Sequence, residues 1–146
     1  MRTLIFTALL LSSGLAQAAN CVIDLKSDDM MKFDQTSVTV AASCKTIEIK
    51  LAHTGKLPIT AMGHNVVISP TPVFQAVAQA GMKAGVAADY VPVGDARVIA
   101  HTKVVGGGGS TTASFPGSAL TAGGDYTFYC SFPGHWAIMK GKLVVE

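Results

Sequence analysis

The chain has 146 residues, of which 49% are hydrophobic and 14% are charged, with a formal net charge of +2 at pH 7. This length suits one domain with a proper core, and the composition excludes a disordered chain. Charged residues fall well below the usual ~25%, so a basic nucleic-acid-binding face, and with it a nucleic-acid partner, is not expected. The three cysteines allow at most one internal disulfide and leave one thiol over.

The first eighteen residues have the pattern of a signal peptide. Arg2 provides a positive end, residues 4–11 form a mostly apolar run, and residues 16–18 read Ala-Gln-Ala, which is typical of a cleavage site. The apolar run is shorter than the ~20 residues that a bilayer span needs, so no membrane span is expected. We therefore predict that residues 1–18 are an export signal and that residues 19–146 form a single domain in a bacterial periplasm.

Alternating apolar and polar residues dominate the mature part of the chain, and this pattern predicts strands with one buried face. Eight stretches are β-rich, and most of them are bounded by Gly, Pro, Asp or Ser. The predicted strands cover residues 21–26, 37–40, 46–51, 66–69, 97–104, 111–115, 125–130 and 140–145. About eight short strands favour an all-β fold, a Greek-key β-sandwich or barrel.

One segment breaks the strand pattern. Residues 72–83 place Val73, Val77 and Ala80 at helical spacing, and Thr71 is a candidate N-cap. We predict a single helix inserted between strands.

The glycine run at residues 106–109 resembles a linker in composition. It lies between two strand patterns only a few residues apart, which favours a flexible hairpin over a domain boundary.

The three cysteines divide into a pair and a single residue. Cys21 and Cys44 flank the first predicted strands at a sequence separation of 23, whereas Cys130 lies at the end of a late strand. A Cys21–Cys44 disulfide is the economical pairing, and it leaves Cys130 as the odd thiol. In an oxidising compartment a free thiol is a liability unless something holds it.

The stretch after Cys130 contains two more side chains that bind metals. His135 and Met139 follow within ten residues, and Pro133-Gly134 lets the chain reverse so that the imidazole turns back towards the sulfur. His64 is the best fourth candidate, because it follows Gly63 directly before a predicted strand. A glycine there lets a main-chain carbonyl approach a metal without obstruction.

Two imidazoles and one thiolate with a weak, distant methionine describe a type 1 copper site. Zinc is the main competing metal, but structural zinc more often uses paired ligands at short spacing such as C-x2-C, and none is present. A thiol hydrolase using Cys130 and His135 is a further alternative, in which Met139 would have no role. A copper-handling or storage protein would favour exposed Met- and His-rich sequences, and only one compact site is visible.

These motifs closely resemble those of the azurin family, small blue copper proteins of bacterial periplasms within the wider cupredoxins. The resemblance covers nearly all of the mature chain and rests on residues 62–65, 97–103, 130–135 and 139–141. It implies a cupredoxin-like copper-binding domain whose disulfide falls at Cys21 and Cys44. It also implies one copper per chain with three in-plane and two axial groups, namely His64, Cys130 and His135 in the plane, Met139 on one axis and the carbonyl of Gly63 on the other.

The resemblance further implies a function in electron transfer. The copper would cycle between Cu(I) and Cu(II) without binding a substrate, so the protein is expected not to be an enzyme. The partner classes would be c-type cytochromes and copper nitrite reductase, met by a monomer through an apolar patch around His135. The candidate patch residues are Met31, Leu57, Met62, Phe132, Pro133 and Trp136. Asn65 is a candidate for tying the two ligand loops together.

Two residues depart from the family pattern. Many azurins have a buried tryptophan directly after the Gly-His-Asn stretch, whereas this chain has Val66, and its one tryptophan is Trp136. Neither change removes a ligand, but packing near Val66 and the surface beside His135 are expected to differ. The other two histidines, His53 and His101, are expected to be packed or surface residues rather than ligands, and the resemblance implies that His53 is a neighbour of the site.

Overall fold

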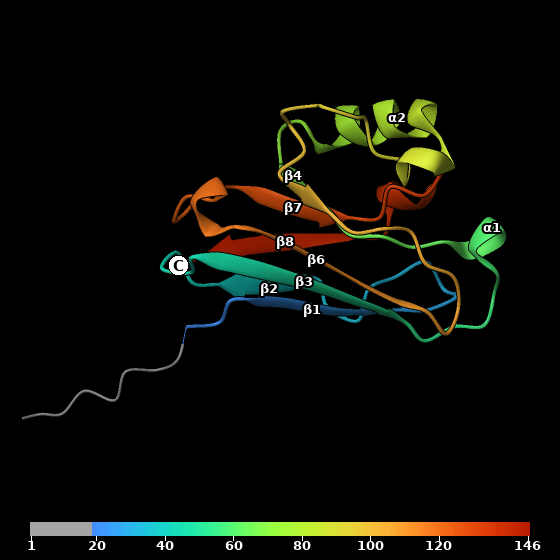
Figure 1. Cartoon of the computed structure of the whole chain (residues 1–146), viewed down its shortest axis with the longest axis horizontal. Helices are drawn as coiled ribbons and strands as arrows, with labels where there is room; N and C mark the ends of the chain where they lie inside the picture. The colour runs from blue at the N-terminus through green and yellow to red at the C-terminus, as the bar shows by residue number, and fades with distance from the viewer. Residues whose placement is uncertain (1–18) are drawn as a thin grey trace, which may run out of the picture.

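The computed structural model describes residues 19–146 as two packed β-sheets with helix α2 on the outside (Figure 1). The predicted export signal, residues 1–18, lies outside the described residues. The strands are β1 (Val22–Ser27), β2 (Ser37–Val40), β3 (Thr46–His53), β4 (Val67–Pro70), β5 (Ala100–His101), β6 (Ser110–Pro116), β7 (Tyr126–Tyr129) and β8 (Lys140–Val145). The helices are α1 (Ile59–Met62) and α2 (Phe74–Ala84), with 3-10 turns η1 (Val86–Ala88), η2 (Gly117–Ala119) and η3 (His135–Ala137).

The two sheets have the orders β1-β3-β6 and β2-β8-β7-β4-β5. The β1–β3 and β2–β8 pairs are parallel, and the remaining pairs are antiparallel. The predicted all-β sandwich of about eight strands with one substantial helix is confirmed, and the sheets remain separate instead of closing into a barrel. No helix within residues 19–146 has the length and apolar character needed to cross a membrane.

The core fills the space between the sheets and follows the alternation seen in the sequence. In the parallel β1–β3 pair, Ile23 aligns with Ile49 and Leu25 with Leu51, and all four side chains are buried. The facing sheet contributes buried side chains from β2, β4, β7 and β8, namely Val38, Val40, Ile68, Phe128, Leu143 and Val145. Each fully buried side chain of this size stabilises the fold by roughly 1.5–3 kcal/mol, so the sandwich is a rigid frame for whatever its loops hold.

The strand predicted at residues 97–104 is wrong for most of its length, because only β5 at Ala100–His101 pairs as a strand. Main-chain hydrogen bonds continue along the same edge without a regular ladder. The nitrogen of Thr102 donates to the carbonyl of Val66, and Val105 forms an isolated bridge with His64. The segment thus leaves the sheet to follow the chain around His64.

The predicted hairpin at residues 106–109 is also wrong, because β5 and β6 belong to different sheets. The glycine run instead crosses from one sheet to the other against residues 53–59. A Cβ atom on Gly106 would lie 2.6 Å from the main-chain nitrogen of Ile59, and one on Gly107 would lie 2.6 Å from Cα of Lys56. Close packing of two backbones, rather than flexibility, explains these glycines.

The predicted helix is confirmed as α2, which buries Phe74, Val77, Ala78 and Gly81. Its N-cap is Val73, without a side-chain capping bond, so the expected N-cap Thr71 is wrong. The hydroxyl of Thr71 instead pairs with the hydroxyl of Thr127 at 2.9 Å, because Pro70 at the end of β4 lies opposite Tyr126 on β7.

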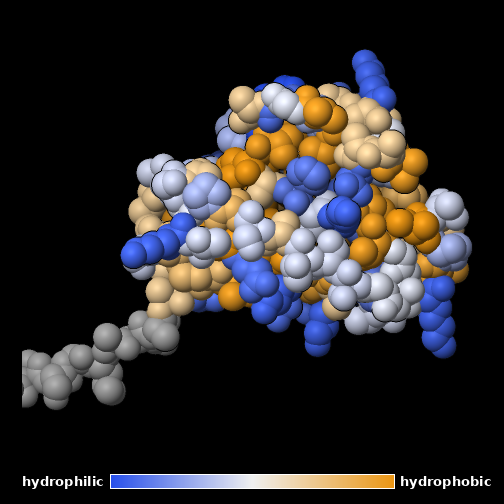
Figure 2. Space-filling model, in the orientation of Figure 1, coloured by the Kyte–Doolittle hydropathy of each residue, from blue (hydrophilic) through white to orange (hydrophobic). Residues whose placement is uncertain are grey.

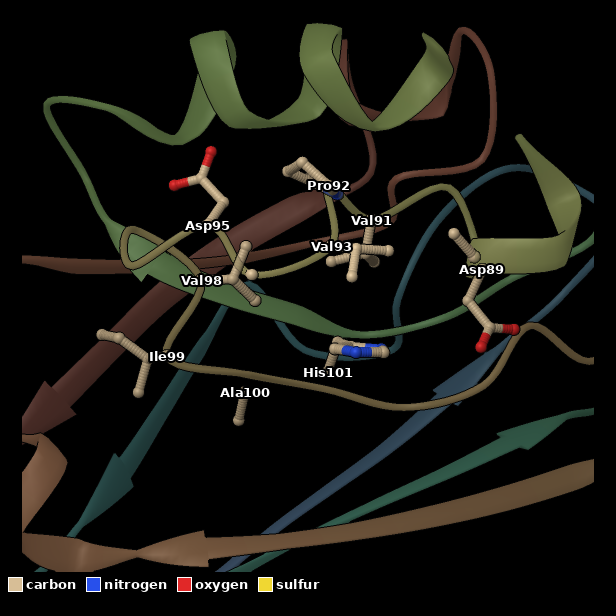
Figure 3. A pocket seen from close by; sticks show the side chains of 11 residues that line it. Asp89, Val91, Pro92, Val93, Asp95, Val98, Ile99, Ala100 and His101 are labelled. Carbon is tan, nitrogen blue, oxygen red and sulfur yellow. The ribbon is translucent and has the colours of Figure 1, made fainter. Parts of the chain in front are cut away.

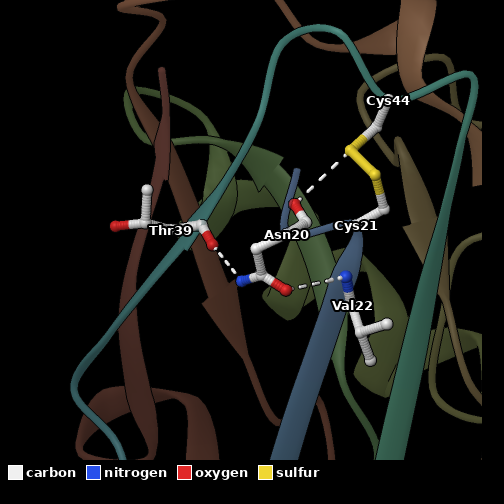
Figure 4. Close-up of a disulfide and its surroundings, with 5 residues drawn as sticks. All are labelled: Asn20, Cys21, Val22, Thr39 and Cys44. Carbon is white, nitrogen blue, oxygen red and sulfur yellow. Dashed lines mark hydrogen bonds between the residues drawn. A yellow bond between two sulfur atoms is a disulfide. The ribbon is translucent and has the colours of Figure 1, made fainter. Parts of the chain in front are cut away.

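The predicted disulfide joins Cys21 to Cys44 (Figure 4). It closes a loop of 23 residues between the start of β1 and the turn before β3, and constraint of the unfolded chain by such a loop contributes about 3 kcal/mol. Cys130 is free and buried, which leaves the odd thiol that the sequence predicts.

Candidate metal centre

Three buried side chains converge at one end of the sandwich. His64 precedes β4 and Cys130 follows β7, and the antiparallel β4–β7 pair, which sets Val67 opposite Tyr129, brings these residues together. The Sγ atom of Cys130 lies 3.7 Å from Nδ1 of His64 and 3.6 Å from Nδ1 of His135. The two Nδ1 atoms lie 3.2 Å apart. Among residues 19–146, this is the one group of His, Cys, Asp or Glu side chains with three or more ligand atoms this close together.

His64 has its ring orientation and tautomer fixed by the main chain. Its Nε2 lies 2.8 Å from the carbonyl oxygen of Asp28, so Nε2 carries the proton and donates it. Its Nδ1 therefore presents a lone pair towards Cys130. A hydrogen bond of this kind to a carbonyl is how proteins orient histidine ligands of metals.

His135 reaches the same point through a tight turn. Gly134 has φ of +83°, a left-handed conformation that glycine adopts without cost. The nitrogen of His135 donates to the carbonyl of Phe132 at 3.0 Å, and its own carbonyl accepts from the nitrogen of Met139 at 2.8 Å. The reversal predicted for Pro133-Gly134 thus turns the imidazole of His135 back towards the sulfur.

The environment favours neutral imidazoles and disfavours a free thiolate. Burial lowers the pKa of His64, and burial followed by the neighbouring His64 lowers the pKa of His135 to about 4. Burial raises the pKa of the Cys130 thiol to about 12. The metal-free site therefore holds lone pairs on both imidazoles and a proton on sulfur, and a metal cation must displace that proton to bind.

The donor set fits a metal ion in size and in chemistry. Metal–nitrogen bonds of about 2.0 Å and metal–sulfur bonds of about 2.3 Å, set around one ion, separate the donor atoms by roughly 3.3–3.7 Å. The edges of the observed triangle, 3.2, 3.6 and 3.7 Å, agree with these separations. One thiolate with two imidazoles is the in-plane set of a type 1 copper site.

Gly63 and Met139, the two residues expected to provide axial groups, both lie beside the triangle of Sγ and Nδ1 atoms. The carbonyl oxygen of Gly63 is 3.9 Å from Sγ of Cys130. Met139 is fully buried, and its carbonyl accepts the hydrogen bond of the Cys130 nitrogen at 3.0 Å, so its main chain runs alongside the sulfur ligand.

A glycine is required at position 63 because neighbouring atoms leave no room for a side chain, and not because of its backbone conformation. A Cβ atom there would lie 2.6 Å from Cγ1 of Val104 and 2.7 Å from the carbonyl oxygen of Ile59. No side chain on residue 63 fits beside Val104 and Ile59. Glycine is therefore needed at position 63 for packing against Val104 and Ile59, and the approach of its carbonyl to a metal stays a prediction.

Asn65, the expected tie between the ligand loops, is buried and uses both ends of its amide. Its Oδ1 accepts from the nitrogen of Ser131 at 2.8 Å, and its Nδ2 donates to Oγ of Ser131 at 2.8 Å. The same Nδ2 donates to the carbonyl of Asp89 at 2.9 Å. Residues directly after His64 and Cys130 are thus locked to each other and to a third segment.

Two further residues lie beside the site, of which the resemblance implied His53 and the sequence did not reveal Asp89. The ring of His53 stacks on that of His64 with centroids 4.4 Å apart, and its Nε2 lies 2.9 Å from the carbonyl of Met62. His53 is buried beside the site, whereas His101 is exposed. Asp89 was missed entirely, because two of its contacts run through its main-chain carbonyl and the third is a bond from the main-chain nitrogen of Val104 to its carboxylate, and no side-chain pattern reveals these partners.

The candidate patch residues differ in exposure. Leu57 and Pro133 are exposed, and Met31, Met62 and Trp136 are partly buried. Phe132, expected on the surface, is buried, because its ring packs between Tyr90 and His135 with centroid distances of 5.3 and 4.7 Å. Trp136 lies against α2, 6.4 Å from the ring of Phe74.

The sequence missed other exposed apolar side chains in the neighbouring segments. Met30, Ile59 and Ile138 are all exposed. Figure 2 shows apolar side chains gathered over α2 and over the end of the molecule that carries α1. Val66, which replaces the tryptophan of many azurins, is fully buried in the core.

The chain matches the family model of copper binding proteins, plastocyanin/azurin family, over residues 19–146. The chain belongs to this family. It is 53% identical over 123 residues to the azurin of Alcaligenes faecalis, which covers 84% of this chain and 96% of that protein. It is 51% identical over 126 residues to the azurin of Bordetella pertussis, covering 86% of this chain and 84% of that protein.

The fold agrees with a solved member of the same family. An azurin (Az-iso2) from Methylomonas sp. strain J is similar at a TM-score of 0.83 and 40% identity, covering 88% of this chain and 99% of that chain. For this member of the plastocyanin/azurin family, the group of His64, Cys130 and His135 is consistent with one type 1 copper.

The lowered pKa of His135 predicts an acid-sensitive metal-free protein. The unfolded chain binds a proton at this residue below about pH 6.5, whereas the folded chain does so only near pH 4. The neutral imidazole of His135 therefore contributes fully to the stability of the folded state above pH 6.5, and this contribution is lost as the pH falls towards 4. NMR titration of the metal-free protein should place the midpoint of the His135 imidazole near 4, and a midpoint near 6.5 would contradict the burial argument.

Proposed function

We propose that the protein carries single electrons on one type 1 copper held by His64, Cys130 and His135. Met139 and the carbonyl of Gly63 are the axial groups in this proposal. The observation that carries it is the buried triangle of two Nδ1 atoms and one Sγ atom, with edges of 3.2–3.7 Å. Membership of the plastocyanin/azurin family supports the same function.

The copper supplies the one-electron Cu(I)/Cu(II) couple when it is bound. The chain supplies a site whose donor atoms are placed before the metal arrives. His64 exchanges two main-chain hydrogen bonds of 2.9 Å with Val105, and Cys130 and Ser131 are held by Met139 and Asn65. Because these bonds come from the frame and not from the metal, the ligands need to move little between the two oxidation states.

Burial of the site favours electron transfer over catalysis. His64, Cys130 and Met139 have no exposed surface, and 4% of His135 is exposed. A substrate would have no route to an open coordination position. The protein is accordingly proposed as an electron carrier and not as an enzyme.

We place the exchange of electrons with partners at the edge of His135. The surrounding candidate patch presents Leu57 and Pro133 without a charge of its own. Such a surface suits brief docking over an area below ~1,200 Å², as redox encounters usually have. The proposed partner classes are c-type cytochromes and copper nitrite reductase.

The cellular setting is part of the same proposal. Residues 1–18 act as an export signal, and residues 19–146 function as a single cupredoxin domain in the periplasm. The protein acts as a monomer that meets its partners transiently. The Cys21–Cys44 disulfide supports this setting, since disulfides persist in oxidising compartments.

Adding Cu(II) to the metal-free protein should give an intense blue colour that bleaches with reduced c-type cytochrome and returns on oxidation. Cys130→Ser should abolish the colour, because the thiolate is lost. A double variant, Cys21→Ser with Cys44→Ser, is the matched control and should stay blue, since that disulfide is not among the ligands. A colourless protein that binds only Cu(I) would instead indicate copper handling or storage.

The docking surface can be tested with one added charge at two exposed apolar positions. Leu57→Asp places a carboxylate in the candidate patch, whereas Val93→Asp places one on the connection between α2 and β5. We expect Leu57→Asp to slow electron exchange with a c-type cytochrome by about tenfold through desolvation of the new charge. Stopped-flow rates that fall equally in both variants would contradict docking at this patch.

A further inference from the structure

Asp89 lies in the connection between α2 and β5, far in sequence from the copper ligands. Its backbone is left-handed, with φ of 53° and ψ of 27°. Asp and Asn tolerate this conformation better than most residues that have a side chain. The turn thereby directs the carbonyl and the side chain of Asp89 to two different parts of the site.

The main-chain carbonyl of Asp89 accepts hydrogen bonds from both ligand loops. Nδ2 of Asn65 donates to it at 2.9 Å, and Oγ of Ser131 donates to it at 3.2 Å. Asn65 directly follows His64, and Ser131 directly follows Cys130. Both donor side chains are almost fully buried, so this single oxygen satisfies polar groups that have no access to water.

The carboxylate of Asp89 holds a third stretch of chain at the site. Its Oδ1 accepts from the main-chain nitrogen of Val104 at 2.8 Å. The next residue, Val105, exchanges two main-chain hydrogen bonds with His64. The carboxylate thus fixes the segment against which the backbone of His64 is aligned.

Tyr90, the next residue, packs the connection between α2 and β5 against the site on one side and against α2 on the other. The ring of Tyr90 meets Phe132 edge-on at 5.3 Å, and Phe132 lies 4.7 Å from His135. The carbonyl of Tyr90 covers Gly81 of α2 so closely that a Cβ atom there would lie 2.0 Å away. Figure 3 shows Asp89 at one end of a pocket along this connection, well separated from Asp95.

We propose that Asp89 is a positioning residue of the copper centre. It does not belong to the ligand triangle, and it acts through Asn65, Ser131 and Val104 to hold both ligand loops in register. The inference rests on copper binding at His64, Cys130 and His135. It does not depend on which protein exchanges electrons with the copper.

The two contacts of Asp89 can be separated by choice of variant. In Asp89→Gly the left-handed turn and the carbonyl remain, and the hydrogen bond that the carboxylate accepts from the nitrogen of Val104 is lost. In Asp89→Asn an amide oxygen can accept the same N–H. Asp95→Gly is the matched control, because Asp95 also accepts a main-chain N–H, that of Arg97 at 3.0 Å, within the same connection.

Cu(II) titration against a competing chelator should show an affinity about tenfold weaker in Asp89→Gly, the usual effect of losing a group that orients metal ligands. Asp89→Asn should recover the affinity to within about twofold, and Asp95→Gly should leave it unchanged. In the copper-free protein, the amide of Val104 should exchange with solvent about tenfold faster in Asp89→Gly alone, a readout independent of the metal.

Unchanged Cu(II) affinity in Asp89→Gly would overturn the positioning role of the Asp89 carboxylate, as would an equal loss in Asp95→Gly. Failure of Asp89→Asn to recover the affinity would also overturn it, since the hydrogen bond would then not be the cause. If the unaltered protein bound no Cu(II), the proposed function would fail first and this inference with it.

Discussion

A sulfur atom buried away from water carries a negative charge only at a high cost in free energy unless a cation lies beside it, and the ligand end of this molecule depends on that constraint. Burial raises the pKa of the Cys130 thiol to about 12 and keeps the imidazoles of His64 and His135 neutral. The site is therefore poorly suited to a free thiolate and well suited to a metal ion that replaces the thiol proton. A bound metal would also protect this unpaired cysteine, because it would occupy the reactive thiolate form.

The rest of the fold keeps three donor atoms in place around that constraint. The β4–β7 pair brings the residues before one strand and after the other to the same end of the sandwich. Asn65 then joins the two ligand loops, and the carbonyl of Asp89 joins them to the connection after α2. Gly63 contributes by having no side chain, because a Cβ atom at this position would collide with Val104. In the proposed function, rigidity of the frame, and not the strength of any single bond, lets one site serve two oxidation states.

Local patterns were enough to predict most of the strands, the helix and the group of His64, Cys130 and His135. Cys130, His135 and Met139 fall within ten residues, so a single turn brings them together, and alternation marks β1, β2, β3, β6 and β8 clearly. Tertiary packing decided the rest. Residues 97–104 alternate as a strand but leave the sheet to follow the chain around His64, and Gly106 and Gly107 are explained by close packing against the backbone of Ile59 and Lys56 rather than by a hairpin. Phe132 is buried because Tyr90 covers it, and Asp89 contributes a main-chain carbonyl, which leaves no mark in a sequence.

X-ray absorption spectroscopy at the copper edge, on the same sample in both oxidation states, tests the central claim most directly. A preorganised site should show one short copper–sulfur bond and two copper–nitrogen bonds in Cu(II), and the same three ligands with little change in distance in Cu(I). Loss of a nitrogen ligand on reduction, or an oxygen ligand from water in either state, would contradict a buried and rigid electron-transfer centre.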